Sequence, residues 1–393
     1  MYKIGFTSNE EKEMDNLITE INNNIEELKQ LKNNISKYFK KMMSNQENIT
    51  IYDSDPNNNY KIFLMNNLKK IKENTVIEGV EKVLEKMVSL FPSNFKHVNS
   101  IPRMTFILSI ASFSSSKLVA VLDDKSIEIY DNQFKTLQSI PNAHSDLIRY
   151  VSVKDEEHFA TCSNDSSIKT WIKIKEDFYK EDKVIPNAHE KSIRKVKYRE
   201  NNDLISCSWD NSVKIWVLEN GSYKNTKKLE HKDAVNCVFV APDINTLISS
   251  GADGTKLWKL NDYKEICNIQ DTYCHGKNTL NRLDKDRFII GGRKDGNIKV
   301  ISFEKRDVVK DIDNGFQCFC ICVTRDKKNF LIGGQQKTII KVYSCSDYEF
   351  KYSVEDLHHN YVRGIINLKD GSIASYSDDK TIQIYKLVEQ KNN

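Results

Sequence analysis

The part of the sequence from about residue 95 to residue 390 repeats with a period of about 42 residues. In each of seven units a short strand-like run ends on an aromatic or aliphatic residue, and successive ends are 41 to 45 residues apart. These ends are Tyr130, Trp171, Trp216, Trp258, Ile301, Tyr343 and Tyr385. An Asp in a turn precedes most of them by six residues, at Asp124, Asp165, Asp210, Asp295 and Asp379, and by five at Asp253. A repeat of this length predicts a chain of small sheets, each of which buries its faces against its neighbours.

The strings around the turn, such as SNDSSIKTW, SWDNSVKIW and SDDKTIQIY, resemble the WD-repeat family. A His stands upstream of the turn in several units, as His358 does in the last, where family repeats open with one. The resemblance implies an all-β fold, a seven-bladed β-propeller. It also implies that in each of three units a His, a hydroxyl, the turn Asp and a Trp hydrogen-bond to one another inside one blade. The three sets are His144, Thr161, Asp165 and Trp171; His189, Ser206, Asp210 and Trp216; and His231, Ser249, Asp253 and Trp258.

A His, a hydroxyl and an Asp are also the parts of a nucleophilic catalytic triad. A triad is needed at one site only, whereas this set recurs in at least three units with similar spacing, as a folding device would. The sequence also has no GxxxxGK phosphate loop, no HExxH and no CxxC pair. We therefore expect a protein that is not an enzyme and that has no catalytic residues, no cofactor and no metal site.

Several units depart from the pattern. The first lacks the opening His, the fifth ends in Ile301, and the sixth has Lys337 in place of the turn Asp. Blades five and six should therefore be the least regular. The last unit has no evident fourth strand after Tyr385, so we expect the run from Asn94 to Ile101 to close the ring.

Residues 1–92 are predicted to be helical, with a loop at about 44–59, and to precede a propeller at 93–390. Positions every seven residues carry an apolar seam of about four heptads, interrupted only by an Asn. The seam consists of Met14, Ile21, Leu28, Ile35 and Met42 with Leu17, Asn24, Leu31 and Tyr38. It can pack on a second helical stretch, about residues 60–90, as a hairpin. It can also form a coiled coil through Met14 to Met42, either with a second copy or with another helical chain.

Charge and composition narrow the partners and the compartment. Charged residues make up 29% of the chain but the net charge is only +4, which makes nucleic acid an unlikely partner. No apolar run has the length of a membrane helix, so we expect no membrane partner. The nine cysteines are scattered and contain no CxxC pair, as in reduced intracellular proteins. We expect a cytoplasmic protein, with the nucleus not excluded.

The resemblance also points to a binding face. In WD-repeat proteins, the residue after the first-strand Ile or Val and the residue before the turn Asp reach the surface around the central channel, where peptides often dock. The candidates here are Arg149, Arg194, Trp209, Asn236, Lys294 and Arg363. Arg and Trp in one patch suit an acidic or phosphorylated peptide, although ordinary exposed residues would give the same pattern. The predicted function is a scaffold or adaptor. The alternative is a signalling subunit similar to the β subunit of heterotrimeric G proteins, which shares only the layout of a helical segment before seven repeats.

Overall fold

The computed structural model describes residues 95–175, 178–199, 202–274, 276–292, 296–336 and 338–387. The predicted helical segment, including the seam from Met14 to Met42, lies outside the described residues, so its coiled coil stays a prediction. The first described residue, Phe95, already belongs to a β-strand.

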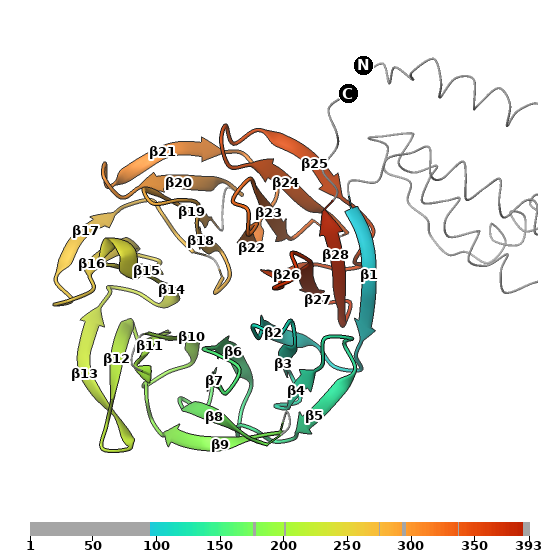
Figure 1. The fold of residues 1–393 in the computed structure, drawn as a ribbon. Coiled ribbons are helices and arrows are strands. Elements are labelled where there is room, and N and C mark those ends of the chain that lie inside the picture. Colours follow the sequence, from blue (N-terminus) through green and yellow to red (C-terminus); the bar gives the residue numbers. More distant parts are fainter. Residues whose placement is uncertain are drawn as a thin grey trace, which may run out of the picture. The chain divides into compact units, whose positions relative to one another are not determined.

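The described residues form a seven-bladed β-propeller, which confirms the predicted fold (Figure 1). Each blade is a sheet of four antiparallel strands, and in blades one to six these strands are consecutive in the chain. Blade one contains β2 (Ile107–Ser112), β3 (Leu118–Leu122), β4 (Ile127–Tyr130) and β5 (Thr136–Ile140). Blade two contains β6 (Ile148–Val153), β7 (His158–Ser163), β8 (Ile168–Lys175) and β9 (Phe178–Ile185). Blade three contains β10 (Ile193–Tyr198), β11 (Leu204–Ser208), β12 (Ser212–Glu219) and β13 (Ser222–Glu230).

The remaining blades follow the same plan. Blade four contains β14 (Val235–Ala241), β15 (Thr246–Gly251), β16 (Gly254–Lys259) and β17 (Glu265–Ile269), with a short 3-10 helix, η2 (Pro242–Ile244). Blade five contains β18 (Leu280–Arg282), β19 (Arg287–Gly291), β20 (Ile298–Ser302) and β21 (Asp307–Ile312). Blade six contains β22 (Cys318–Val323), β23 (Asn329–Gly334), β24 (Ile340–Ser344) and β25 (Phe350–Val354). Blade seven contains β26 (Val362–Asn367), β27 (Ile373–Ser377), β28 (Thr381–Leu387) and β1 (Phe95–Pro102).

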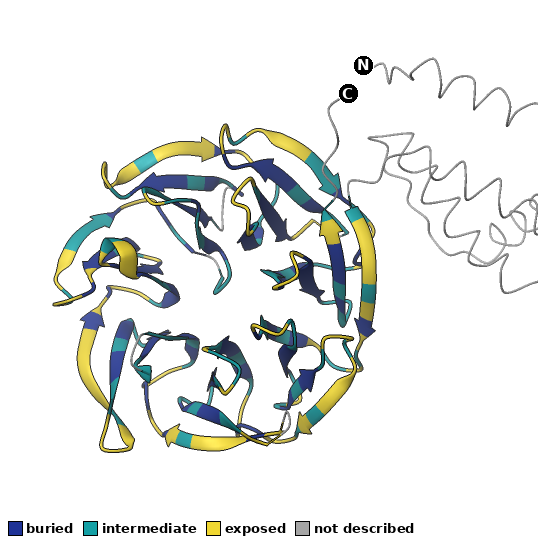
Figure 2. Ribbon diagram, viewed as in Figure 1, coloured by how far each residue is buried: buried dark blue, intermediate teal, exposed yellow. Residues whose placement is uncertain are grey.

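The core of the propeller lies between neighbouring blades. The second strand of blade three, β11, is buried along its whole length, whereas most residues of the outer strand β13 are exposed. Figure 2 shows the same gradient around the ring, with dark inner strands and a yellow outer rim. Apolar side chains of one blade pack on those of the next, as Val213 of blade three does in a cluster with Leu247 of blade four. Apolar burial between blades therefore provides the main driving force for the ring.

Strand β1 closes the ring. It pairs with β28 in an antiparallel register that sets Phe95 opposite Leu387 and Ile101 opposite Ile382. The prediction for the run from Asn94 to Ile101 is thereby confirmed. Because blade seven combines strands from both ends of the repeat region, the last strand of the final unit is not left as an open edge.

Blade five is irregular, as predicted, since its inner strand β18 has only three residues. Blade six is not: its strands have five or six residues each, like those of other blades. The prediction of an irregular blade six was wrong in this respect. Within this blade Phe330 stacks on Tyr343 with ring centroids 5.2 Å apart, as Phe159 stacks on Trp171 in blade two.

Candidate functional site

The innermost strand of six blades carries a β-bulge at the same place. The register with the second strand shifts directly after the first Ile, Val or Cys of the strand, as between Ile193 and Lys195 in blade three. The bulged residues are Leu108, Arg149, Arg194, Asn236, Phe319 and Arg363. A bulge leaves its residue outside the ladder and redirects the side chain. This explains why four predicted binding residues have the same position in their blades. Leu108 and Phe319 occupy this position too, directly after the first residue of the inner strand, but the sequence analysis did not single them out.

Bulged residues of blades two to four join with residues of the turns into one group, which we call the Arg194 site: Arg149, Asn164, Arg194, Trp209 and Asn236. The Arg149 Nε donates to Asn164 Oδ1 at 2.7 Å. The Arg194 guanidinium lies over the Trp209 ring, 4.5 Å from its centroid. The Trp209 Nε1 donates to Asn236 Oδ1 at 2.9 Å, which connects blade three to blade four.

Accessibility differs within the Arg194 site. Trp209 is 42% exposed, unusually high for a tryptophan, whereas Asn236 is only 6% exposed. Asn236 also donates through Nδ2 to the carbonyl of Cys274 at 3.0 Å. Asn236 therefore orients Trp209 from beneath, and the surface offered to a ligand consists of Trp209 with the partly exposed arginines.

The positive charge of Arg194 is not balanced within the site. Its Nε is buried and has no hydrogen-bond partner in the described part of the chain. Burial, together with the nearby charge of Arg149, lowers the pKa of Arg194 to about 10. A desolvated guanidinium that faces a second guanidinium gains from a negatively charged ligand, because an anion would supply both the counter-charge and a hydrogen-bond acceptor.

Arg363 belongs to a different group. Its Nε donates to both carboxylate oxygens of Asp378 at 2.9 Å, and its guanidinium lies 4.4 Å from the centroid of the Phe319 ring. Tyr361 is a further aromatic neighbour, at 5.6 Å. Arg363 thus contacts blade six, and its charge is balanced within blade seven. The structure does not bring it together with Arg149 and Arg194, and Lys294 lies outside the described residues.

The four-residue sets form hydrogen-bonded chains inside blades two, three and four. In blade three the Trp216 Nε1 donates to Ser206 Oγ at 2.8 Å, and His189 lies 2.7 Å from Ser206 Oγ and 2.8 Å from Asp210. The corresponding His–Asp distances are 2.9 Å for His144 and 2.7 Å for His231. Blade seven has a fourth set that the sequence analysis did not assemble, in which His358 lies 3.0 Å from Asp379 and 2.8 Å from Ser375.

The hydroxyl and the imidazole of the chain in blade three are shielded from solvent. Ser206 is fully buried and His189 is 2% exposed. Burial lowers the pKa of His189, which keeps the imidazole neutral. Burial alone would raise the pKa of Asp210, but hydrogen bonds from His189 and Ser212 outweigh it and hold that pKa well below its usual range. The neutral imidazole of His189 then donates from Nδ1 to the Asp210 carboxylate and accepts at Nε2 from the Ser206 hydroxyl.

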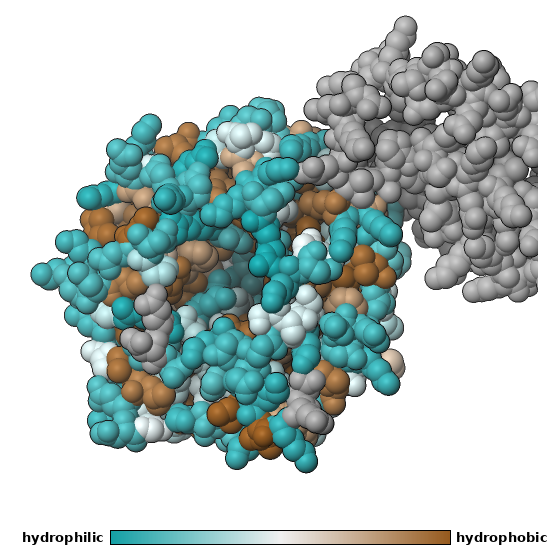
Figure 3. Space-filling model, in the orientation of Figure 1, coloured by the Kyte–Doolittle hydropathy of each residue, from teal (hydrophilic) through white to brown (hydrophobic). Residues whose placement is uncertain are grey.

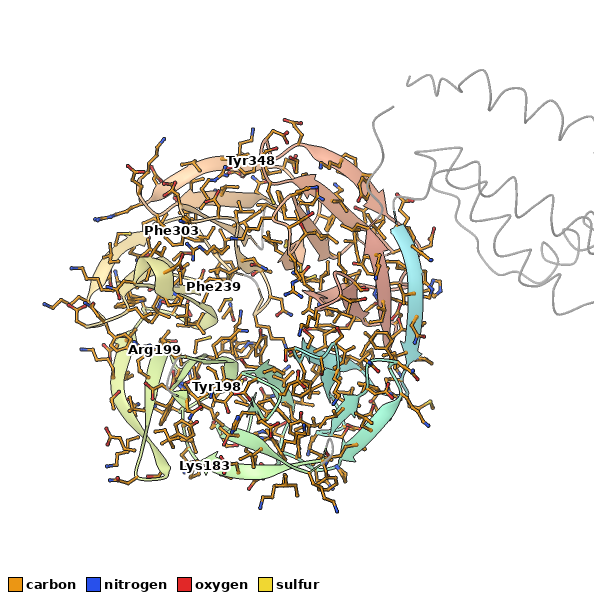
Figure 4. The ribbon with its side chains drawn as sticks, in the orientation of Figure 1. Lys183, Tyr198, Arg199, Phe239, Phe303 and Tyr348 are labelled. Carbon is orange, nitrogen blue, oxygen red and sulfur yellow. The ribbon has the colours of Figure 1, made fainter. Side chains whose placement is uncertain are left out.

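Arginine–aromatic contacts hold several loops at the other ends of the inner strands. The Arg199 guanidinium lies over the Tyr263 ring of blade four, and Arg287 of blade five lies over Tyr348 of blade six. Within blade five, Arg282 lies over Phe303. Figure 4 labels Arg199, Phe303 and Tyr348, which come from different blades around the ring. The face drawn in Figure 3 is hollowed over the centre of the ring and carries mostly hydrophilic residues around the hollow.

Comparison with known families matches part of the propeller. The family described as WD domain, G-beta repeat matches residues 182–217 and 223–259. Both matched stretches begin in the outer strand of one blade and end in the third strand of the next, so each repeat links two blades. A search among curated proteins returns no match. Within the described ranges, no helix is long and apolar enough to cross a membrane. The chain therefore forms a seven-bladed β-propeller, and two consecutive stretches of it, residues 182–217 and 223–259, match the WD repeat.

Proposed function

We propose that the propeller is a non-catalytic scaffold that binds an acidic or phosphorylated segment of a partner protein at the Arg194 site. The observation that carries the proposal is the stacked pair of Arg194 and Trp209, whose ring is 42% exposed while the guanidinium lacks a counter-charge. Tryptophan and arginine are the residue types that most often dominate binding energy at protein interfaces. WD-repeat propellers generally serve as binding platforms, which agrees with this assignment.

The ligand's charge follows from the residues that line the site. Arg149 and Arg194 are both partly exposed, and their hydrogen bonds and stacking contacts involve only the neutral side chains Asn164 and Trp209. Arg363 adds little to this field, because Asp378 balances it. A carboxylate or phosphate can accept hydrogen bonds from the guanidinium groups while an apolar neighbour covers the indole.

The nine cysteines, all described, are free, and eight of them are buried, which supports a reducing compartment such as the cytoplasm. The alternative of a subunit similar to the β subunit of heterotrimeric G proteins depends on the helical segment before Phe95. That segment lies outside the described residues, and no observation favours this alternative over the scaffold.

The test is a pull-down with the full chain, followed by affinity measurement for each recovered partner. We expect Arg194→Ala or Trp209→Ala to weaken a propeller partner by about 1 to 4 kcal/mol, roughly 5- to 700-fold in Kd. Lys224→Ala is the matched control, because this lysine lies on the outer strand β13 with its side chain 58% exposed. Unchanged melting midpoints would show that the variants are folded. A partner that binds the double variant Arg194→Ala with Trp209→Ala as well as the parent would refute the assignment.

A further inference from the structure

Residues 276–279, which we call the channel segment, lie on the axis of the ring. Lys277 Nζ donates to the carbonyl of Leu108 in blade one at 2.6 Å and to that of Arg149 in blade two. The carbonyl of Lys277 accepts from Lys195 of blade three at 2.8 Å. Asn278 accepts from the Ile321 amide of blade six at 2.8 Å.

Further contacts place the segment against the other blades. The Cys237 thiol of blade four lies 3.3 Å from the Lys277 carbonyl, and Asn278 donates to the Tyr376 hydroxyl of blade seven at 2.9 Å. Tyr376 can enter the channel because position 364 is a glycine, where a Cβ would collide with the tyrosine ring. Two consecutive residues of the connection between β17 and β18 thereby contact all blades except blade five, to which this connection leads. Figure 1 shows the chain before β18 reaching towards the centre of the ring.

The channel around this segment is strongly positive. The ammonium groups of Lys195, Lys197 and Lys277 lie 5.3, 5.5 and 5.9 Å from the centroid of one ring, that of Tyr150. Burial lowers the pKa of Lys277 well below its usual value, and the charges of Arg194 and Arg149, at the bulges, lower it further. Five basic side chains thus gather around the axis.

The protein balances little of this charge. Lys277 donates to backbone carbonyls, Lys195 to a carbonyl and a thiol, and Arg149 to an amide. In the ranges that the structure covers, none of the five basic side chains makes an ion pair with Asp or Glu. Burial alone would raise the pKa of Cys237, but hydrogen bonds from Cys274 and Lys195 lower it to about 6.

We infer that the channel beside Lys277 binds a compact anion of the phosphate class that carries more than one negative charge. Three lysine ammonium groups near one ring, with two arginines at the adjacent bulges and, among the described residues, no Asp or Glu ion pair to any of the five, favour a multiply charged group over a single carboxylate. Because the channel segment occupies the axis, the anion has to be small. Lys277, Lys197 and both arginines are partly accessible, whereas Lys195 is 4% exposed and acts from beneath.

This site goes beyond the peptide-binding function proposed above, because it requires neither Trp209 nor a protein ligand. The phosphate group can be a free phosphate compound, or it can be carried by a protein that docks at the Arg194 site. The two sources share the same chemistry at Lys277, so the experiment has an arm for each.

The experiment measures the melting midpoint of the full chain, and its binding heat, with pyrophosphate at constant ionic strength. The comparison uses chloride and a phosphoserine peptide with its unphosphorylated form. Lys277→Met keeps most of the length of the side chain and removes its charge. Lys264→Met is the matched control, since that side chain is 80% exposed. Without anion we expect Lys277→Met to fold with a midpoint equal to or above that of the parent, because it removes a poorly compensated charge.

We expect pyrophosphate to raise the midpoint of the parent and of Lys264→Met, and to bind Lys277→Met at least tenfold more weakly. A response to the phosphoserine peptide only, lost in Lys277→Met, would assign the phosphate to a protein ligand. Trp209→Ala separates the two proposals: it should weaken a protein partner and leave pyrophosphate binding unchanged. Equal responses of the parent and Lys277→Met, or no response to either phosphate source at millimolar concentration, would overturn the inference.

Discussion

Replacing Asp210 by Ala should destabilise the propeller more than replacing any exposed acid, because Asp210 completes a buried chain of hydrogen bonds. The carboxylate accepts from four donors. They are His189 Nδ1 at 2.8 Å, the amides of Glu190 and Ser212 at 3.1 Å each, and Ser212 Oγ at 2.6 Å. Its side chain is only 3% exposed, so water does not replace these bonds in the folded chain.

The magnitude follows from those contacts. A hydrogen bond to a charged group contributes about 1.5 to 3 kcal/mol, and a buried donor left without an acceptor costs about 1 to 3 kcal/mol. The four terms do not add, because Ser212 and His189 belong to the same network and can shift together. We therefore expect a loss of about 3 to 5 kcal/mol in the free energy of unfolding, the range for breaking a buried charged pair.

Denaturant unfolding of the full chain, followed by tryptophan fluorescence, measures this loss, since Trp216 packs on the His189 ring with centroids 6.3 Å apart. Asp233→Ala is the matched control, because Asp233 is exposed and accepts only from a neighbouring backbone amide. Ser206→Ala, alone and with Asp210→Ala, should give a combined loss that differs from the sum of the two. A free energy of unfolding within about 0.5 kcal/mol of the parent for Asp210→Ala would refute the reasoning.

Three further outcomes are expected. Burial lowers the pKa of His189 and His231, so as the pH falls the unfolded chain binds protons before the folded chain does. The free energy of unfolding should therefore decrease as the pH drops below about 6.5. Equal free energies of unfolding at pH 7.5 and pH 5.5 would contradict this. A thiol reagent should modify Cys267 first and the eight buried cysteines only on unfolding, which mass spectrometry can check. A chain that begins at Met104 lacks β1 and exposes the edge of β28. It should therefore unfold less cooperatively than the full chain and bind a hydrophobic dye. Fully cooperative unfolding of this shortened chain would mean that β1 is dispensable.

The repeat spacing was sufficient to predict seven blades, because a WD-type unit fixes its own strands through local contacts between the turn Asp, the His and the Trp. The ring closure by β1 was also predictable, since the sequence shows no evident strand-like run after Tyr385 and the run from Asn94 to Ile101 offers one. Blade six shows where this reasoning failed. The absence of an Asp at position 337 was read as a sign of irregular strands, yet blade six keeps four strands of five or six residues without it.

The binding residues were predictable only as positions. Counting from the first strand finds each bulge, but it does not say whether a neighbouring turn neutralises the side chain. Arg194 and Arg363 occupy equivalent bulges, and they differ because Trp209 precedes the turn Asp in blade three and Asp378 precedes it in blade seven. That difference was visible in the sequence. The position of Lys277 was not, since it depends on the path of a long connection between β17 and β18 that no repeat pattern fixes.

The contrast between residues that the repeat requires and residues that it leaves open explains how a repetitive fold can carry a single specific site. His, Asp and Trp recur because each blade needs them for the contacts within its own sheet. The inner-strand residues that face the channel are not needed for these contacts, and they differ from blade to blade. Tyr150, Lys195 and Cys237, for example, occupy corresponding positions in blades two, three and four, each directly after the bulge. Since seven inner strands converge on one axis, a few changes at this position concentrate charge there. The fold therefore permits a positive channel, and the residues of this sequence around Lys277 produce one.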